Sequence, residues 1–293
     1  MTNPTDRYIH AATRENTRKS YRAAIEHYES VWGGYLPATA DSVALYLAHY
    51  APTLAINTLK LRLSGLAAWH NDQGFPDPTK APHVKKVLKG IAELHPHSEA
   101  QAKPLLLKEL RTVVMWFDSN LDSEACSRAH RLKFVRNKAL FLIGFWRAFR
   151  SDELTRISIE NVTVIPGKGL EIFLPRSKTD RRSLGRRVRV PALQQLCPVS
   201  AYLDWVNEAQ LRDGPLFQGI NRWGHLSENA LHPASVISII KKSCSGAGIS
   251  DSNDYSSHSL RRGFATWSNT QQWDIVWRQL SWPVGDNYDG RLG

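Results

Sequence analysis

Much of this chain repeats apolar residues at helical spacing, but the stretch over residues 162–190 has the pattern of strands instead. Within it, residues 162–165, 169–174 and 187–190 are short, β-branched or alternating, and glycines lie between them. Such segments, separated by glycine, predict strands. We therefore expect a mainly α-helical protein that carries one small three-stranded β-sheet.

Amphipathic helices are expected on both sides of this stretch, because apolar residues at every third or fourth position line one helix face. The pattern predicts helices over residues 14–33, 40–50, 55–71, 83–95, 107–120, 129–149, 198–208, 234–244, 258–270 and 274–280. The prolines within residues 74–82 end the third helix, because proline cannot continue a helix. Thr39 and Asp41 are both candidate caps for the second.

A polar segment divides the chain into two parts. Residues 95–103 (HPHSEAQAK) lack periodicity and have the composition of a linker, and Pro104 opens the next unit. We predict an all-helical domain over residues 1–97, a linker over 98–104 and a mostly helical domain with the sheet over 105–293. A length of 293 residues with 42% hydrophobic content suffices for two domains with packed cores.

Charge and cysteine content narrow the function classes. The chain has 38 Lys plus Arg against 27 Asp plus Glu, a formal net charge of +11. This excess favours a polyanionic partner, because each neutralised phosphate releases counterions, although a merely basic soluble protein is the plain alternative. Cys126, Cys197 and Cys244 form no CxxC pair, which argues against a disulfide framework or a zinc site and fits a reducing cytoplasm.

The sequence shows no targeting or membrane segment. Its first residues are polar and lack the apolar core of a secretory signal. The longest apolar run, residues 139–146, is too short to span a bilayer. We expect a cytoplasmic protein without a membrane partner.

Residues 258–266 (HSLRRGFAT) place His258 and Arg261 three positions apart, and therefore on one face at a helix start. An imidazole and a guanidinium side by side in a basic chain can hold an anion, and the other basic positions upstream favour a nucleic-acid phosphate. A lone H-x-x-R occurs often by chance, so the motif needs support from the rest of the chain.

Two further basic residues lie upstream in the same predicted domain. Arg150 ends a very apolar predicted helix, and Glu153, three residues on, can orient its guanidinium. The plain alternative is a helix-terminal arginine that binds carbonyl groups. Lys178 lies in PRSKTDRR between two predicted strands, where a hairpin tip can reach a ligand, although a lone lysine in a turn is usually solvated.

Taken in order, these features resemble the tyrosine recombinase (phage integrase) family: A-F-R-x-x-E-L, a lysine on a β-hairpin, then H-x-x-R-R-G-x-A-T. The N-terminal residues 16–21, the helix ending at residues 67–70 and the PDPT turn at 76–79 resemble that family's core-binding domain. The resemblance covers nearly the whole chain. It implies a helical N-terminal core-binding domain that clamps DNA, followed by a mostly helical catalytic domain with the small sheet.

The resemblance implies a site-specific DNA recombinase of the kind found in mobile genetic elements. In that family a tyrosine hydroxyl attacks a DNA phosphodiester, forms a 3′-phosphotyrosyl link and frees a 5′-hydroxyl, without metal or cofactor. Arg150 and Arg261 would grip the non-bridging oxygens in fork geometry. Lys178 would protonate the departing 5′-oxygen, and His258 would assist proton transfer. Trp282 would donate its indole N–H to the phosphate.

The nucleophile is where the chain departs from the family's pattern. Tyr288 is the only tyrosine after Trp282 and follows it more closely than the family usually places its tyrosine, next to a turn-like PVGDN segment. The usual spacing falls on Arg291. Three interpretations stay open: Tyr288 attacks from a remodelled loop, the chain lacks a true nucleophile, or Tyr255 serves instead. We assign Tyr288.

The same resemblance implies double-stranded DNA as the partner and four protomers on paired sites. Phosphate contacts from the N-terminal domain are assigned to Thr17, Arg18, Lys60, Arg62, Lys85, Lys86 and Lys89. The plain alternative for the lysines is a solvated helix face. Three other functions remain open: a cleavage-deficient DNA-binding relative, a type IB topoisomerase-like enzyme, and a basic helical scaffold that leaves the ordered Arg–Lys–His–Arg set unexplained.

Overall fold

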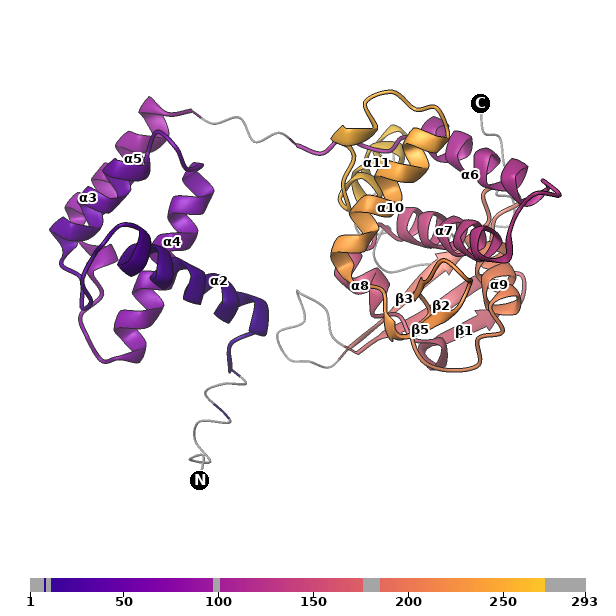
Figure 1. The fold of residues 1–293 in the computed structure, drawn as a ribbon, viewed down its shortest axis with the longest axis horizontal. Coiled ribbons are helices and arrows are strands. Elements are labelled where there is room, and N and C mark those ends of the chain that lie inside the picture. The colour runs from indigo at the N-terminus through magenta and orange to yellow at the C-terminus, as the bar shows by residue number, and fades with distance from the viewer. Residues whose placement is uncertain (1–7, 9–11, 97–100, 176–184, 272–293) are drawn as a thin grey trace. The chain divides into compact units, whose positions relative to one another are not determined.

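The computed structural model describes residues 8, 12–96, 101–175 and 185–271, and the structural statements below concern these residues. The chain forms two compact units, residues 1–100 and 101–293, which divide within the predicted linker (Figure 1). In the described ranges, no helix has both the length and the apolar content that crossing a bilayer requires.

The first unit consists of helices joined by short loops. Its elements are α2 (Glu15–Glu26), a π-helical turn (His27–Val31), α3 (Ala40–Tyr50), α4 (Ile56–Asp72), a 3-10 turn (Pro78–Lys80) and α5 (Pro82–Leu94). α2 packs on α4, and α3 packs on α5. The four helices predicted from the sequence in this region are confirmed, and Thr39 rather than Asp41 caps α3 by accepting the N–H of Ser42 at 3.2 Å.

The buried His70 fixes the loop before α3 onto α4. Its Nδ1 lies 2.7 Å from the carbonyl oxygen of Leu66, and its Nε2 accepts the backbone N–H of Ala38 at 2.9 Å. The two contacts require the tautomer with the proton on Nδ1. The Trp69-His70 end of the helix therefore has a structural function in this unit.

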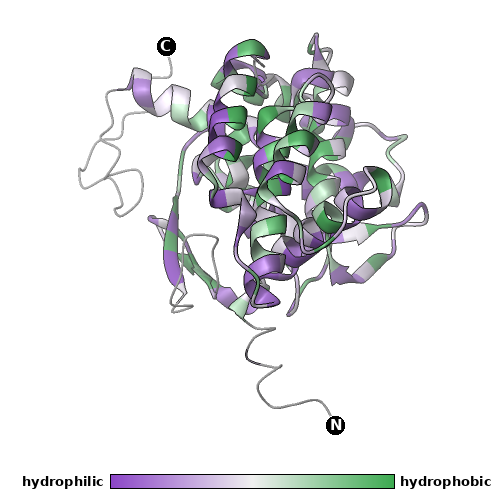
Figure 2. Cartoon of the chain, turned by 90° about the vertical axis from the view of Figure 1, so that its left-hand side faces the viewer, coloured by the Kyte–Doolittle hydropathy of each residue, from purple (hydrophilic) through white to green (hydrophobic). Residues whose placement is uncertain are grey.

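The second unit is built around α7 (Arg128–Trp146), a largely buried helix that packs on α6 (Leu107–Leu121), α9 (Pro198–Glu208), α11 (Ser259–Thr270) and one strand of the sheet (Figure 1). Most of its last ten residues belong to the core. Figure 2 shows that many helices of the chain carry both hydrophobic and hydrophilic residues. A short helix, α8 (Ser151–Thr155), and α10 (Pro233–Gly246) complete the helical part.

The predicted three-stranded sheet is confirmed. β1 (Val162–Ile165), β2 (Gly169–Leu174) and β3 (Arg186–Pro191) are antiparallel in the order β1-β2-β3, and Leu174 pairs with Arg186. A second, two-stranded sheet of β4 (Gln218–Ile220) and β5 (Leu226–Ala230) was not predicted. Its strands lack the alternation that marks a strand, because β5 is exposed over most of its length.

The prediction that Arg150 ends the apolar helix is wrong. α7 ends at Trp146, short of the predicted end at residue 149, because Ala148 takes a left-handed backbone conformation with φ of +52°. The turn is closed by the N–H of Phe149, which donates to the carbonyl of Gly144 at 3.0 Å. Arg150 is the N-cap residue of the next helix, α8.

Candidate active site

The centre of the site is the buried carboxylate of Glu153 at the start of α8. Its Oε2 accepts the backbone N–H of Arg150 at 3.1 Å, and its Oε1 accepts from the Arg150 guanidinium at 3.1 Å. Glu153 is 1% exposed, and a charge removed from water in this way needs such partners. The carboxylate therefore fixes the Arg150 side chain, about a third of which (32%) remains exposed.

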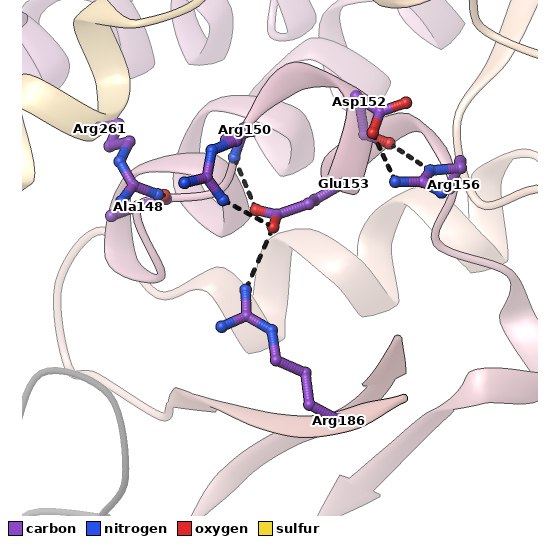
Figure 3. A network of polar contacts seen from close by, with 7 residues as sticks. All are labelled: Ala148, Arg150, Asp152, Glu153, Arg156, Arg186 and Arg261. Atoms are coloured by element: carbon purple, nitrogen blue, oxygen red, sulfur yellow. Dashed lines mark hydrogen bonds and ion pairs between the residues drawn. The ribbon is translucent and has the colours of Figure 1, made fainter. Parts of the chain in front are cut away.

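Arg261 reaches the same centre from α11. Its Nη1 donates to the carbonyl oxygen of Ala148 at 3.0 Å, two positions before Arg150 (Figure 3). Burial lowers the pKa of Arg261, and the positive charge of Arg150 lowers it further. Figure 3 shows both guanidinium groups beside the turn that contains Ala148. The structure thus brings together Arg150 and Arg261.

Close packing holds α11 in this position. A Cβ on Gly263 would lie 1.7 Å from the carbonyl oxygen of Leu105, so only glycine fits there. The N–H of Leu105 also donates to the carbonyl of Ser259 at 3.0 Å. The glycine of the R-R-G motif is therefore a packing requirement that positions Arg261.

Arg186, at the start of β3, is a member of the site that sequence reasoning missed. Its Nη2 donates to Glu153 Oε1 at 3.3 Å, so one carboxylate oxygen accepts from two arginines (Figure 3). Strand alternation is the signal that could have found it, because Arg186 has the same parity as the buried Val188 and Val190. The predicted strand began at residue 187 and left Arg186 out.

Arg147 adds a fourth guanidinium near Glu153. Burial lowers its pKa to about 10, the charge of Arg186 lowers it as well, and Glu153 partly offsets both effects. Four arginines (147, 150, 186 and 261) around one carboxylate leave an excess of positive charge. A fixed excess of positive charge is suited to stabilising the negative charge that develops on a reacting phosphate.

The remaining predicted catalytic residues are placed as follows. His258 is exposed at the N-cap of α11, one turn before Arg261, and its backbone N–H donates to Ser256 Oγ at 3.1 Å. Lys178 belongs to residues 176–184, and Trp282 and Tyr288 belong to residues 272–293, so all three lie outside the described residues.

Tyr255 is ruled out as an accessible nucleophile. Its side chain is 1% exposed, and its buried hydroxyl has no hydrogen-bond partner. Burial raises its pKa to about 12, and the neighbouring negative charge of Glu109 acts in the same direction. A DNA phosphate has no route to this hydroxyl without opening the core.

The predicted DNA contacts of the first unit lie on three helices. Thr17 and Arg18 are on α2, Lys60 and Arg62 are on α4, and Lys85, Lys86 and Lys89 are on α5, where all three lysines are exposed. Arg62 differs from the lysines, because its guanidinium donates to the carbonyl of Ala23 and so links α4 to α2. Arg18 likewise donates to the carbonyl of Thr13.

Within the described ranges, no group of three or more His, Cys, Asp or Glu residues is arranged to hold a metal ion. What the site offers is a cluster of guanidinium groups on rigid elements. Such a cluster binds and polarises a phosphate through charge-assisted hydrogen bonds.

Comparison with known proteins identifies the family. The chain is 31% identical over 270 residues to an integrase/recombinase xerD homolog of Selenomonas ruminantium, across 89% of this chain and 75% of that protein. The chain belongs to the tyrosine recombinase family. The family, the fold class and the enzyme class expected from the sequence are thereby confirmed, although no family model matches the chain.

A further relative and one solved structure match the chain over different shares of its length. The chain is 27% identical over 146 residues to the recombinase cre of Escherichia phage P1, across 50% of this chain and 41% of that protein. Its fold matches a lambda integrase tetramer bound to a Holliday junction with a TM-score of 0.59 and 17% identity, across 98% of this chain and 79% of that one.

Proposed function

We propose that this recombinase cuts and rejoins double-stranded DNA at the centre formed by Arg150 and Arg261, through a 3′-phosphotyrosyl intermediate. The observation that carries the proposal is that Arg150 is bonded to the buried carboxylate of Glu153, while Arg261 is bonded to Ala148 in the turn just before Arg150. Two preorganised forks on rigid elements can bind the non-bridging oxygens of one phosphodiester as charge builds on them. The bond energy is kept in the covalent link, so no cofactor is needed.

The other roles follow from the chemistry of each side chain. His258, exposed one turn before Arg261, is assigned to proton transfer near neutral pH. Lys178 is assigned to protonation of the departing 5′-oxygen, and Trp282 to an indole N–H donated to the phosphate. Tyr288 is assigned as the nucleophile, and the burial of Tyr255 supports this choice by removing its rival.

We assign DNA clamping to the first unit, with residues 1–97 as the core-binding domain, 98–104 as the linker and 105–293 as the catalytic domain. The exposed lysines of α5 support contacts to the DNA phosphate backbone, which position a protein on DNA without reading the base sequence. The lambda integrase neighbour is a tetramer on a Holliday junction, which supports four protomers on paired sites. Because its substrate is DNA and its relatives are bacterial or phage proteins, we assign it to the cytoplasm.

A covalent capture experiment tests the proposal. The full chain is incubated with a library of nicked duplexes of random sequence, so that cleavage next to the nick traps the protein on DNA. Adducts that survive denaturation are isolated and sequenced, which also gives the cleavable site. We expect the wild type to form adducts and Tyr288→Phe to form none, while Tyr35→Phe, at an exposed tyrosine of the first unit, behaves as the wild type.

The spacing of Tyr288 from Trp282 favours one second candidate, a relative that binds DNA without cleaving it. If the wild type binds DNA but forms no adduct, the protein is a relative that binds DNA without cleaving it. Adducts formed by Tyr288→Phe would show that another residue is the nucleophile. Relaxation of supercoiled DNA without exchange between two sites would point to topoisomerase-like activity.

A further inference from the structure

Glu153 divides one carboxylate oxygen between two arginines that come from different parts of the fold. Its Oε1 accepts from Arg150 at 3.1 Å and from Arg186 at 3.3 Å (Figure 3). Its Oε2 accepts only the backbone N–H of Arg150 among the contacts described for that atom. Arg186 therefore competes with Arg150 for the same acceptor.

This competition bears on how Arg150 can act. A buried carboxylate that bonds to one guanidinium alone holds it strongly, because charge-assisted hydrogen bonds strengthen where water is excluded. A second guanidinium on the same oxygen takes up part of the negative charge and weakens the hold of Glu153 on Arg150. The Arg150 fork then keeps its orientation while it retains more of its positive charge for an incoming phosphate.

The setting of Arg186 supports this role. Its side chain is 38% exposed, but its Nε is buried and has no hydrogen-bond partner. The guanidinium is therefore directed at Glu153, although this orientation leaves the Nε–H without an acceptor. The next residue along the strand, Arg187, is 70% exposed and bonds to Glu171 on the solvent side of the sheet at 2.8 Å. The two neighbours therefore serve different carboxylates on opposite sides of β3.

We propose that Arg186 is a positioning residue for DNA cleavage, acting on Arg150 through the carboxylate of Glu153. The inference rests on the proposed function, because it concerns the step in which Arg150 binds the scissile phosphate. Arg186 sets how tightly Glu153 holds Arg150 and does not touch the DNA.

The first test compares Arg186→Met with Arg187→Met, a matched removal of charge one residue along the same strand. Single-turnover cleavage is measured on a nicked duplex selected by covalent capture, at saturating protein, together with the DNA dissociation constant. We expect Arg186→Met to slow cleavage by about 10-fold or more while the dissociation constant stays within about 2-fold, since residues that orient a reacting group typically contribute this much. Arg187→Met is expected to change neither quantity.

The second test establishes the route through Glu153. The Arg186→Met change is made in the wild type and in Glu153→Gln, and the two cleavage ratios are compared as a double-mutant cycle. We expect the effect of Arg186→Met to shrink to less than about 3-fold in the Glu153→Gln protein, because the negative charge that both arginines share is gone. An undiminished effect would show that Arg186 acts by a route other than Glu153 and would overturn the inference.

Arg186→Lys provides a variant that keeps the charge and is closest in size. We expect it to restore part of the cleavage rate without restoring the full bonding pattern, because lysine lacks the planar fork. If Arg186→Met does not fold, as judged by circular dichroism, Arg186→Lys takes its place in both tests. Equal cleavage rates for wild type and all Arg186 variants would refute the inference alone, whereas absence of adducts from the wild type would refute the proposed function.

Discussion

The second unit contains two glutamates that each bind two arginines, and they differ in burial and in what they connect. Glu153 is 1% exposed and joins the start of α8 to the start of β3. Glu171 on β2 is 18% exposed and bonds to Arg187 and Arg189, both on the adjacent strand. One glutamate and two arginines thus form a buried link between distant segments in one case and a cross-strand surface cluster in the other.

The comparison shows that composition alone does not make a site. Exposed ion pairs contribute little, because water and salt screen them. Breaking a buried pair costs more, because the group left behind keeps its charge without a partner. Only the buried cluster can hold guanidinium groups in a fixed geometry for a ligand, and the predictions below test this difference.

The largest difference between the Glu153 cluster and the Glu171 cluster is expected in the rate of DNA cleavage. Arg150→Ala or Arg261→Ala should slow strand cleavage by about 10²–10³-fold, the usual effect of removing one preorganised donor to a developing negative charge. Arg189→Ala, in the exposed cluster, should leave the rate unchanged. Adduct formation on the selected nicked duplex measures the rate, and DNA binding is measured in parallel. Wild-type rates for both Arg150→Ala and Arg261→Ala would remove the proposed phosphate grip.

A smaller difference between the two clusters is expected in their contribution to folding stability. Glu153→Ala should lower the free energy of unfolding by about 2 kcal/mol, because it leaves two partly buried guanidinium groups and a backbone N–H without their acceptor. Glu171→Ala should lower it by less, and added salt should reduce its effect. Denaturant unfolding of the two variants makes the comparison. Equal losses would mean that burial does not distinguish the clusters.

The exposed cluster should show itself in the pH dependence of stability. The hydrogen bond from Arg187 lowers the pKa of Glu171 below its usual value of 4.5. A lowered pKa means that the stabilisation is complete at pH values above 4.5 and is lost as pH falls through the lower folded-state pKa. Thermal unfolding of wild type and Glu171→Gln should therefore differ near neutral pH and converge in acid. A difference that grows as pH falls would contradict this sign.

The smallest effect is expected at the turn that carries Arg261's acceptor. Ala148 has φ of +52°, a conformation that glycine adopts without strain. Ala148→Gly relieves that strain, which stabilises the folded state, but it also raises the conformational entropy of the unfolded chain, which opposes the gain. The free energy of unfolding should therefore change by less than about 1 kcal/mol. The carbonyl that accepts from Arg261 is retained, and the cleavage rate should stay close to that of the wild type. A large loss of cleavage would show that the side chain of Ala148 has a role of its own.

The sequence predicted most of the fold because helical periodicity is a repeated signal. The helices over residues 40–50 and 198–208 and the strands over 162–165 and 169–174 fall on α3, α9, β1 and β2 with the same bounds. The end of α7 was missed because the left-handed turn at Ala148 contains no glycine or proline to mark it. β4 and β5 were missed because short, exposed strands carry no alternation.

The candidate site was predicted in part for a similar reason. Arg150 and Arg261 lie in motifs whose order along the chain resembles a known family, and the structure brings them together. Arg186 lies in the arginine-rich run from residue 181 to 189, where composition does not say which side chain turns inward. The parity of Arg186 with the buried Val188 and Val190 answers that question only once the strand is known to begin at residue 186.

The hydrogen bond from Leu105 to Ser259 has a mechanical consequence. Leu105 follows shortly after the linker, and its N–H is bound to the residue next to His258. A second bond, from the N–H of Lys103 to the carbonyl of Asp254, lies just before it at 3.0 Å. These two bonds attach residues 103 and 105 to the segment at the start of α11, so a displacement of this stretch of the second unit acts at the N-terminal end of α11, beside the proposed proton-transfer histidine.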